Sequence, residues 1–221
     1  MTIKARRDGV QAIPRARGRP TSDMAARIDR DILEAARSLF FGHGYARTSM
    51  AMIVRAAGVS KTTLYARYTD KAELFRATVA SALKQIGVAH LTSPEYAHCP
   101  LVEGLQRFGC TALDNSLGEL WSGYERLVFA EGPSFPEMTE VVAERVQVAI
   151  GHVAQFLEMC MQRDGIVVAE PRALATSYMM AIRGYYTAAL LAARQPPVEE
   201  RHAFVQQLVG SLLRDQPLRQ A

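Results

Sequence analysis

Residues 48–74 read TSMAMIVRAAGVSKTTLYARYTDKAEL. Thr48 and Ser49 belong to the residue types that cap helix N-termini, so a short helix is expected to begin directly after them. Gly58 is expected to end this helix, because glycine adopts positive φ values without strain. The inward positions of the helix are predicted to be Ile53, Ala56 and Ala57.

A second short helix is predicted directly after the glycine, over the sequence SKTTLYARY. Ser60 is expected to cap it, and Leu64 is expected to point inward. Asp70 and Glu73 then have the spacing of a capping box, which predicts a further helix beginning at Lys71.

Helical periodicity continues on both sides of this stretch. Upstream, a helix is expected to end at Gly42 and Gly44. Its apolar positions are Ile28, Ile32, Ala35, Ala36, Leu39 and Phe40. Downstream, helical segments lie between turn signals at Ser93-Pro94, Cys99-Pro100, Gly132-Pro133, Pro136, Asp164-Gly165, Pro171 and Pro196-Pro197. No strand-like run is longer than residues 166–168, so the predicted fold class is all-α.

Two short helices joined by a tight glycine-containing turn form a helix-turn-helix. The first helix braces the second, which lies in the DNA major groove, about 12 Å wide. Small residues are needed where the helices cross, and residues 56–58 supply them. The exposed face of the second helix must offer hydrogen-bonding groups without bulky apolar side chains. The residues that meet this need are Ser60, Lys61, Thr62, Thr63 and Tyr65.

The stretch from Ile32 to Leu74 closely resembles the N-terminal DNA-binding domain of TetR-family regulators. The family pattern ends its first helix in Gly-Tyr, starts the second with Thr-Ser and continues AGVS-K-x-x-LY-x-x-[FY]-x-x-K-x-x-L. The matching residues are Gly44-Tyr45, Thr48-Ser49, residues 57–61, Leu64-Tyr65, Tyr68, Lys71 and Leu74. The chain departs at Thr62, where the family often has Gly, and at Arg67, where it often has His. These two departures put the operator sequence beyond prediction.

The resemblance implies individual roles on DNA. The expected phosphate contacts, which set position rather than sequence, are Thr48, Tyr65 and Lys71, with Arg47 and Arg55 as further candidates. The candidates for base edges are Lys61, Thr62 and Thr63. For each residue the alternative is a solvated surface position.

For residues 76–221 the resemblance implies a helical ligand-sensing and dimerisation domain. Residues 127–137, 171–173 and 182–185 look like the AefR-like subgroup of these regulators. A homodimer is expected through the last two helices, about 171–194 and 198–214. Their apolar stripes, which would also suit an intramolecular core, comprise Ala175, Met179, Ile182, Tyr186, Ala189 and Leu190, and then Phe204, Leu208, Ser211 and Leu212.

A pocket for a small apolar or aromatic effector is expected among the central helices. Its candidate lining residues, which ordinary core packing would explain equally, are Phe108, Trp121, Tyr124, Phe156, Met159, Cys160 and Tyr178. Glu125 and Arg126 are candidate polar anchors in the same region, with solvent exposure as the alternative.

Charge is unevenly distributed along the 221 residues. The chain has 26 basic and 22 acidic residues. Residues 1–75 contain 14 basic and 7 acidic residues, a net charge of +7. Residues 76–221 contain 12 basic and 15 acidic residues, a net charge of −3. A basic front half favours a polyanion contacted by one end, and DNA is the obvious candidate. Residues 1–22 are expected to form a flexible basic arm or a solvated tail, and residues 23–75 the DNA-binding domain.

Other function classes find little support. No apolar run is long enough for a membrane span and no secretory signal is recognised, so a cytoplasmic protein is expected. Cys99, Cys110 and Cys160 are expected to be buried or free thiols. A metal site from His90, His98, Cys99 and Cys110 matches no established zinc spacing, and no phosphate loop or nucleophile elbow occurs.

The sequence therefore predicts a transcriptional regulator, acting as a repressor, with no enzymatic activity, cofactor or metal. An architectural DNA-binding protein that keeps the fold without a single operator stays open as an alternative.

Overall fold

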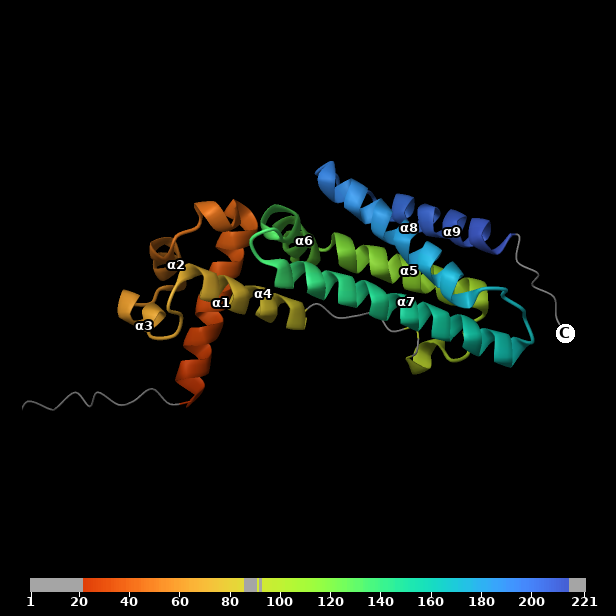
Figure 1. Ribbon diagram of the computed structural model, residues 1–221, viewed down its shortest axis with the longest axis horizontal. Helices are drawn as coiled ribbons and strands as arrows, with labels where there is room; N and C mark the ends of the chain where they lie inside the picture. The colour runs from red at the N-terminus through yellow and green to blue at the C-terminus, as the bar shows by residue number, and fades with distance from the viewer. Residues whose placement is uncertain (1–21, 86–90, 92, 215–221) are drawn as a thin grey trace, which may run out of the picture.

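The computed structural model describes residues 22–85, 91 and 93–214 (Figure 1). The basic arm expected over residues 1–22, apart from Ser22, and the candidate metal ligand His90 lie outside these ranges. Throughout the described ranges the chain is helical with no strand, which confirms the predicted all-α class.

The helices are arranged in two groups along the long axis of the molecule (Figure 1). The first group is α1 (Ser22–Arg47), α2 (Met50–Ala57), α3 (Lys61–Tyr65) and α4 (Lys71–Gln85). The short 3-10 helix η1 (Pro94–Tyr96) follows it. The second group is α5 (Leu101–Leu117), α6 (Glu119–Glu131), α7 (Pro136–Asp164), α8 (Pro171–Leu191) and α9 (Val198–Leu213). Among the helices described here, none is long and apolar enough to cross a bilayer.

The first hydrophobic cluster joins the helix-turn-helix to the rest of the chain. Ile32, Ala36 and Phe40 stack at four-residue intervals on α1, as predicted, and all three are fully buried. Their cluster includes residues of α2, α3 and α4, and it continues through Trp121 and Tyr124 of α6 to the first turns of α7. Apolar packing therefore does not divide at residue 75, where the sequence suggested a domain boundary.

The second cluster lies among α5, α7, α8 and α9. Its helices cross closely at Gly109, where a Cβ atom would lie 2.4 Å from the hydroxyl of Tyr178. That hydroxyl donates a 2.6 Å hydrogen bond to the Leu105 carbonyl, so it is held in place. Glycine is needed at this crossing because no larger side chain fits without moving a neighbour.

The predicted apolar stripe of α8 belongs largely to this core. Ala175, Ile182, Tyr186 and Ala189 are buried inside the protein's own chain, so they are not available to a second subunit. The prediction that they form a dimer interface is wrong, because the stripe periodicity of a core helix and of an interface helix is the same.

Most helix boundaries follow the predicted turn signals. Pro136 and Pro171 each begin a helix at its first position, and Gly165 ends α7 with a positive φ of 65°. Two boundaries differ from prediction. Helix α1 continues through Gly42 and is interrupted at Gly44, where φ is 79°, and α5 ends at Gly118 without a predicted signal.

Candidate nucleic-acid interface

Helix α2 and the turn after it are built as the sequence predicts. The Ser49 hydroxyl accepts a hydrogen bond from the Met52 N–H at 3.3 Å, which caps the helix. Gly58 adopts the left-handed conformation with φ of 64°, and its N–H donates to the Arg55 carbonyl. Ile53 is fully buried, but Ala56 is exposed, so the prediction of Ala56 as an inward residue is wrong.

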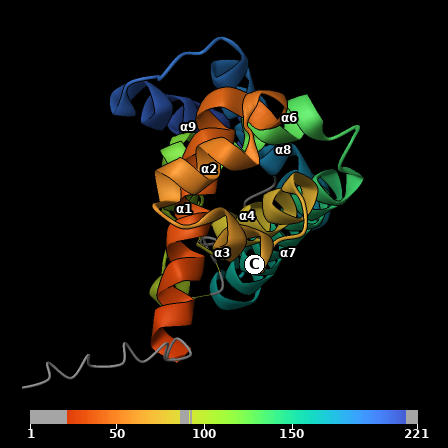
Figure 2. The same cartoon turned by 90° about the vertical axis from the view of Figure 1, so that its left-hand side faces the viewer.

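Helix α3 presents one face to solvent and one to the core. The Ser60 hydroxyl accepts the Thr63 N–H at 3.0 Å and lies 2.8 Å from the Thr63 hydroxyl, so this pair fixes the start of the helix. Leu64 is fully buried and anchors the other side. Lys61, Thr62 and Tyr65 are exposed. Helix α3 lies at the end of the molecule that Figure 2 turns toward the viewer.

Thr48 lies in the interior rather than at the surface. Its hydroxyl lies 2.8 Å from the Gly44 carbonyl and 3.2 Å from the Leu39 carbonyl, and the residue is 2% exposed. Its side chain therefore fastens the corner between α1 and α2. The prediction that Thr48 contacts a phosphate is wrong, because its hydroxyl is buried against these carbonyls. The family motif identifies the position of the residue but not the direction of its side chain.

Lys71 binds the same corner from the other side. Its ammonium donates to the carbonyls of Tyr45 and Thr48, at 3.0 and 3.1 Å, and lies 4.1 Å from the centroid of the Tyr45 ring. Lys71 thus ties the start of α4 to the start of the helix-turn-helix. Since an ammonium carries three N–H groups, one is left over for a phosphate oxygen.

Arg67 makes contacts that the sequence did not predict. Its Nε donates to the Asp29 carboxylate of α1 at 2.5 Å, and its Nη1 donates to the Thr63 carbonyl. The residue that differs from the family pattern therefore connects the end of α3 to α1. The partner lies 38 positions away along the chain, so no local signal could have revealed it.

The remaining basic candidates are at the surface. Arg47 is exposed and donates to the His43 carbonyl at 2.9 Å, near the end of α1. Arg55 is exposed in the last turn of α2. Arg47, Arg55 and Lys61 are thus exposed positive charges on α1, α2 and α3, which suits contact with a phosphate backbone.

Comparisons with known families agree with this geometry. The model for the bacterial regulatory proteins of the tetR family matches residues 32–78, and the model for the C-terminal domain of AefR-like transcriptional repressors matches residues 103–214. The chain belongs to the TetR family.

Curated relatives match part of this TetR-family chain. The transcriptional repressor ComR of Escherichia coli is 39% identical over 84 residues, which are 38% of each chain. The regulator TtgR of Pseudomonas putida is 38% identical over 63 residues, 28% of this chain and 30% of its own. The matched region thus spans well under half of either relative. By their names, one relative is a transcriptional repressor and the other a transcriptional regulator.

Solved structures resemble the whole fold. A TetR-family regulator from Mesorhizobium loti superposes with a TM-score of 0.71 at 23% identity, covering 86% of this chain and 96% of its own. The flavonoid-responsive regulator FrrA gives a TM-score of 0.63 at 25% identity, covering 88% and 100%. The two-part arrangement of helices is therefore shared with regulators of this family.

The seven candidate effector contacts do not converge. Phe108, Phe156, Cys160 and Tyr178 belong to the second cluster, with Met159 packed against it, whereas Trp121 and Tyr124 belong to the first. The expectation of one pocket lined by all seven does not fit this division, because hydrophobicity and helical spacing do not identify which core a residue joins.

A buried ion pair connects α6 to α8. Glu125 is fully buried, and its carboxylate lies 3.3 and 3.5 Å from the guanidinium of Arg183. The Tyr186 hydroxyl lies 3.3 Å from the same carboxylate. Burial raises the pKa of Glu125, and Arg183 opposes that shift. Of the two candidate anchors, Glu125 is thus internal and Arg126 is exposed.

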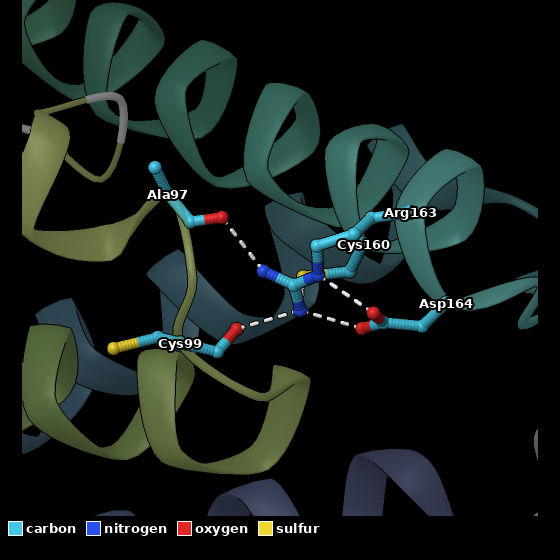
Figure 3. A network of polar contacts seen from close by, with 5 residues as sticks. All are labelled: Ala97, Cys99, Cys160, Arg163 and Asp164. Atoms are coloured by element: carbon cyan, nitrogen blue, oxygen red, sulfur yellow. Dashed lines mark hydrogen bonds and ion pairs between the residues drawn. The ribbon is translucent and has the colours of Figure 1, made fainter.

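Arg163 organises the far end of α7 (Figure 3). Its guanidinium donates to the carbonyls of Ala97 and Cys99, each at 2.8 Å, and pairs with Asp164. Hydrogen bonding from Arg163 lowers the pKa of Asp164. The network fastens the segment before α5 to the end of α7. Cys99, Cys110 and Cys160 are free thiols, and within the described ranges no three metal-ligating side chains are grouped.

Proposed function

We propose that the protein is a sequence-specific DNA-binding repressor that a small, mostly apolar or aromatic effector releases from its operator in the cytoplasm. The exposed polar face of α3 carries the proposal. Leu64 fixes the inner side of α3 in the core, while Lys61, Thr62 and Tyr65 face solvent. The E. coli relative is itself named a repressor.

The candidate residues fall into two groups, those that contact base edges and those that contact phosphates. Lys61 and Thr62 suit base edges in the major groove, since an ammonium and a hydroxyl can donate to acceptors there. Thr63 is half-buried and its hydroxyl is paired with Ser60, so both contribute by ordering α3. Phosphate contacts fall to Tyr65, Arg47 and Arg55, with the remaining N–H of Lys71 as an addition.

The proposed homodimer uses the outer faces of α8 and α9. Beyond the first turns of the two helices, the exposed positions are Thr176, Ser177, Met180, Gly184, Ala188 and Leu191 on α8, and Ala203, Gln206, Gln207, Gly210 and Ser211 on α9. None of these side chains is charged, and depletion of charge is typical of interface centres. Two-fold symmetry would place two copies of α3 on half-sites one helical turn apart or a multiple of it.

An Ala188→Glu variant tests this interface. The carboxylate would be buried between subunits, so we expect a dimer-to-monomer shift in sedimentation velocity. Ala143→Glu on the exposed side of α7 adds the same charge away from the face and should remain dimeric. A dimeric Ala188→Glu protein would contradict the proposed interface.

The effector is proposed to act through a conformational equilibrium. A ligand shifts such an equilibrium only if it binds one state more tightly, and typical couplings are about 1–3 kcal/mol. An apolar or aromatic ligand is supported by the aromatic content of the interior, and FrrA, a structural neighbour, is described as flavonoid-responsive.

The decisive experiment is fluorescence anisotropy with DNA from upstream of the protein's own gene. A scrambled duplex is the control, and both are titrated at two salt concentrations. We expect a preference of about a thousandfold or more for the upstream DNA. A double Lys61→Ala, Thr62→Ala variant should reduce that preference while keeping salt-sensitive binding.

Two results would count against the proposal. Equal, salt-sensitive binding to both duplexes would favour the architectural alternative. Absence of binding to either duplex at low salt would contradict a DNA-binding function altogether.

A further inference from the structure

A groove lies where α4 meets α6 and α7. Its volume is about 250 Å³. The wall is almost entirely apolar, and its main contributors are Phe75, Val79, Tyr124, Phe135, Met138 and Val141. A ligand in this groove would contact α4 of the first helix group and α6 and α7 of the second group at the same time.

The charged lining residues of the groove are Arg76 and Glu137. The Arg76 Nε donates to the Glu137 carboxylate at 2.8 Å, and the guanidinium lies 5.4 Å from the centroid of the Phe135 ring. Both side chains are about half exposed, so the pair lies at the mouth. Within the described ranges the terminal Nη1 and Nη2 groups of Arg76 have no acceptor.

We propose that this groove binds a small monocarboxylate with an apolar body, such as an aryl or medium-chain alkyl acid. The two Nη groups of a guanidinium match the two oxygens of a carboxylate. At about 30 Å³ for each water-sized group, the groove holds about eight such groups, which suits a phenyl ring or a short chain. The inference rests on the proposed function in taking this acid as the effector.

The groove is connected to the DNA-binding corner by aromatic contacts. The ring centroids of Phe75 and Phe135 are 4.7 Å apart, and that of Tyr45 lies 4.8 and 5.0 Å from them. Lys71 rests on the Tyr45 ring and donates to the Thr48 carbonyl directly before α2. Because packed interiors transmit displacement, a ligand that moves Phe75 or Phe135 acts on the position of α2.

The test uses the full-length protein, with octanoate as probe and octan-1-ol as its neutral match. Binding is measured by calorimetry and by the fluorescence of Trp121, the single tryptophan of the chain, whose ring centroid is 5.6 Å from that of Tyr124. We expect saturable binding of octanoate that is tighter than that of octan-1-ol. Acetate, which lacks the apolar body, should not saturate.

Two variants separate the carboxylate contact from the apolar contact. Arg76→Gln should weaken octanoate about tenfold or more, the range of a charge-assisted hydrogen bond. Val141→Phe should also weaken it, because the added ring fills the groove. Arg172→Gln removes the same charge from an exposed site on α8 and should bind octanoate like the parent protein. Circular dichroism confirms that each variant is folded.

The outcomes distinguish this inference from the proposed function. Equal affinities for octanoate and octan-1-ol, or unchanged binding by Arg76→Gln, would overturn the anion site. Unchanged binding by Val141→Phe would overturn the groove as its location. Saturable binding without any change in operator affinity would overturn the regulatory role. Calorimetry needs no DNA. Failure of the protein to bind an operator would therefore contradict the proposed function without affecting the evidence that the groove binds octanoate.

Discussion

Replacement of Lys71 by methionine separates a contribution to the fold from a contribution to DNA binding. Methionine keeps an unbranched apolar side chain but removes the ammonium. The variant therefore loses the hydrogen bonds to the carbonyls of Tyr45 and Thr48 and the contact with the Tyr45 ring. Lys61→Met is the matched control, because Lys61 is exposed on α3 and its replacement removes the same charge.

The magnitude follows from these contacts. Hydrogen bonds from charged groups contribute about 1.5–3 kcal/mol each, with the lower end appropriate for a half-buried side chain. A contact between a cation and a ring at a partly exposed site adds about 0.5–1 kcal/mol. We therefore expect Lys71→Met to lower the free energy of unfolding by about 3.5–4 kcal/mol and Lys61→Met by less than about 0.5 kcal/mol.

Urea denaturation followed by far-UV circular dichroism measures the unfolding difference, and anisotropy measures operator binding. Because only Lys71 of the two is proposed to contact a phosphate, Lys71→Met should reduce the salt slope by about 0.9, whereas Lys61→Met should mainly reduce the preference for the upstream DNA. Equal stability of the two variants would refute the reasoning, because the Lys71 ammonium would then contribute nothing to the corner of α1 and α2.

Three further predictions concern stability. Gly109→Ala should cost about 1–3 kcal/mol in urea denaturation because its Cβ meets a tyrosine hydroxyl, whereas Gly151→Ala in open space on α7 should be neutral or stabilising. Because the pKa of Glu125 is raised, its carboxylate binds a proton more readily in the folded state than in the unfolded state. The parent protein should therefore gain stability relative to Glu125→Gln as the pH falls from neutral toward about 4.3. A stability difference between the two proteins that does not change with pH would contradict this. A double-mutant cycle of Arg67→Gln with Asp29→Asn should give a coupling of about 0.5–1 kcal/mol, and additive effects would show that the pair does not stabilise the fold.

The helix-turn-helix could be predicted from sequence because its determinants are local. Ser49, Gly58 and Ser60 act on backbone groups within a few residues of themselves, so residue type and spacing carry the information. The predicted capping box of Asp70 and Glu73 forms only in part. The Glu73 carboxylate accepts hydrogen bonds from Thr69 rather than from the Asp70 N–H, while Asp70 caps as expected.

Contacts between distant segments could not be predicted in the same way. Thr48 and Lys71 match the family pattern, but their direction depends on carbonyls of α1 and on the corner that follows it. The inner and outer faces of α8 could not be told apart because both are apolar or small. The groove escaped prediction because its wall combines residues more than 50 positions apart, from Phe75 to Val141.

The continuity of the first hydrophobic cluster has a consequence for building chimeric regulators. A graft that takes residues 22–85 alone would separate Phe40 and Phe75 from Trp121, Tyr124 and their neighbours, leaving two apolar surfaces without partners. The transferable operator-reading module is therefore discontinuous in sequence, and it includes α6 and the first two turns of α7. Hybrids that retain these segments from the same parent should stay soluble and responsive, whereas those joined directly after α4 should aggregate.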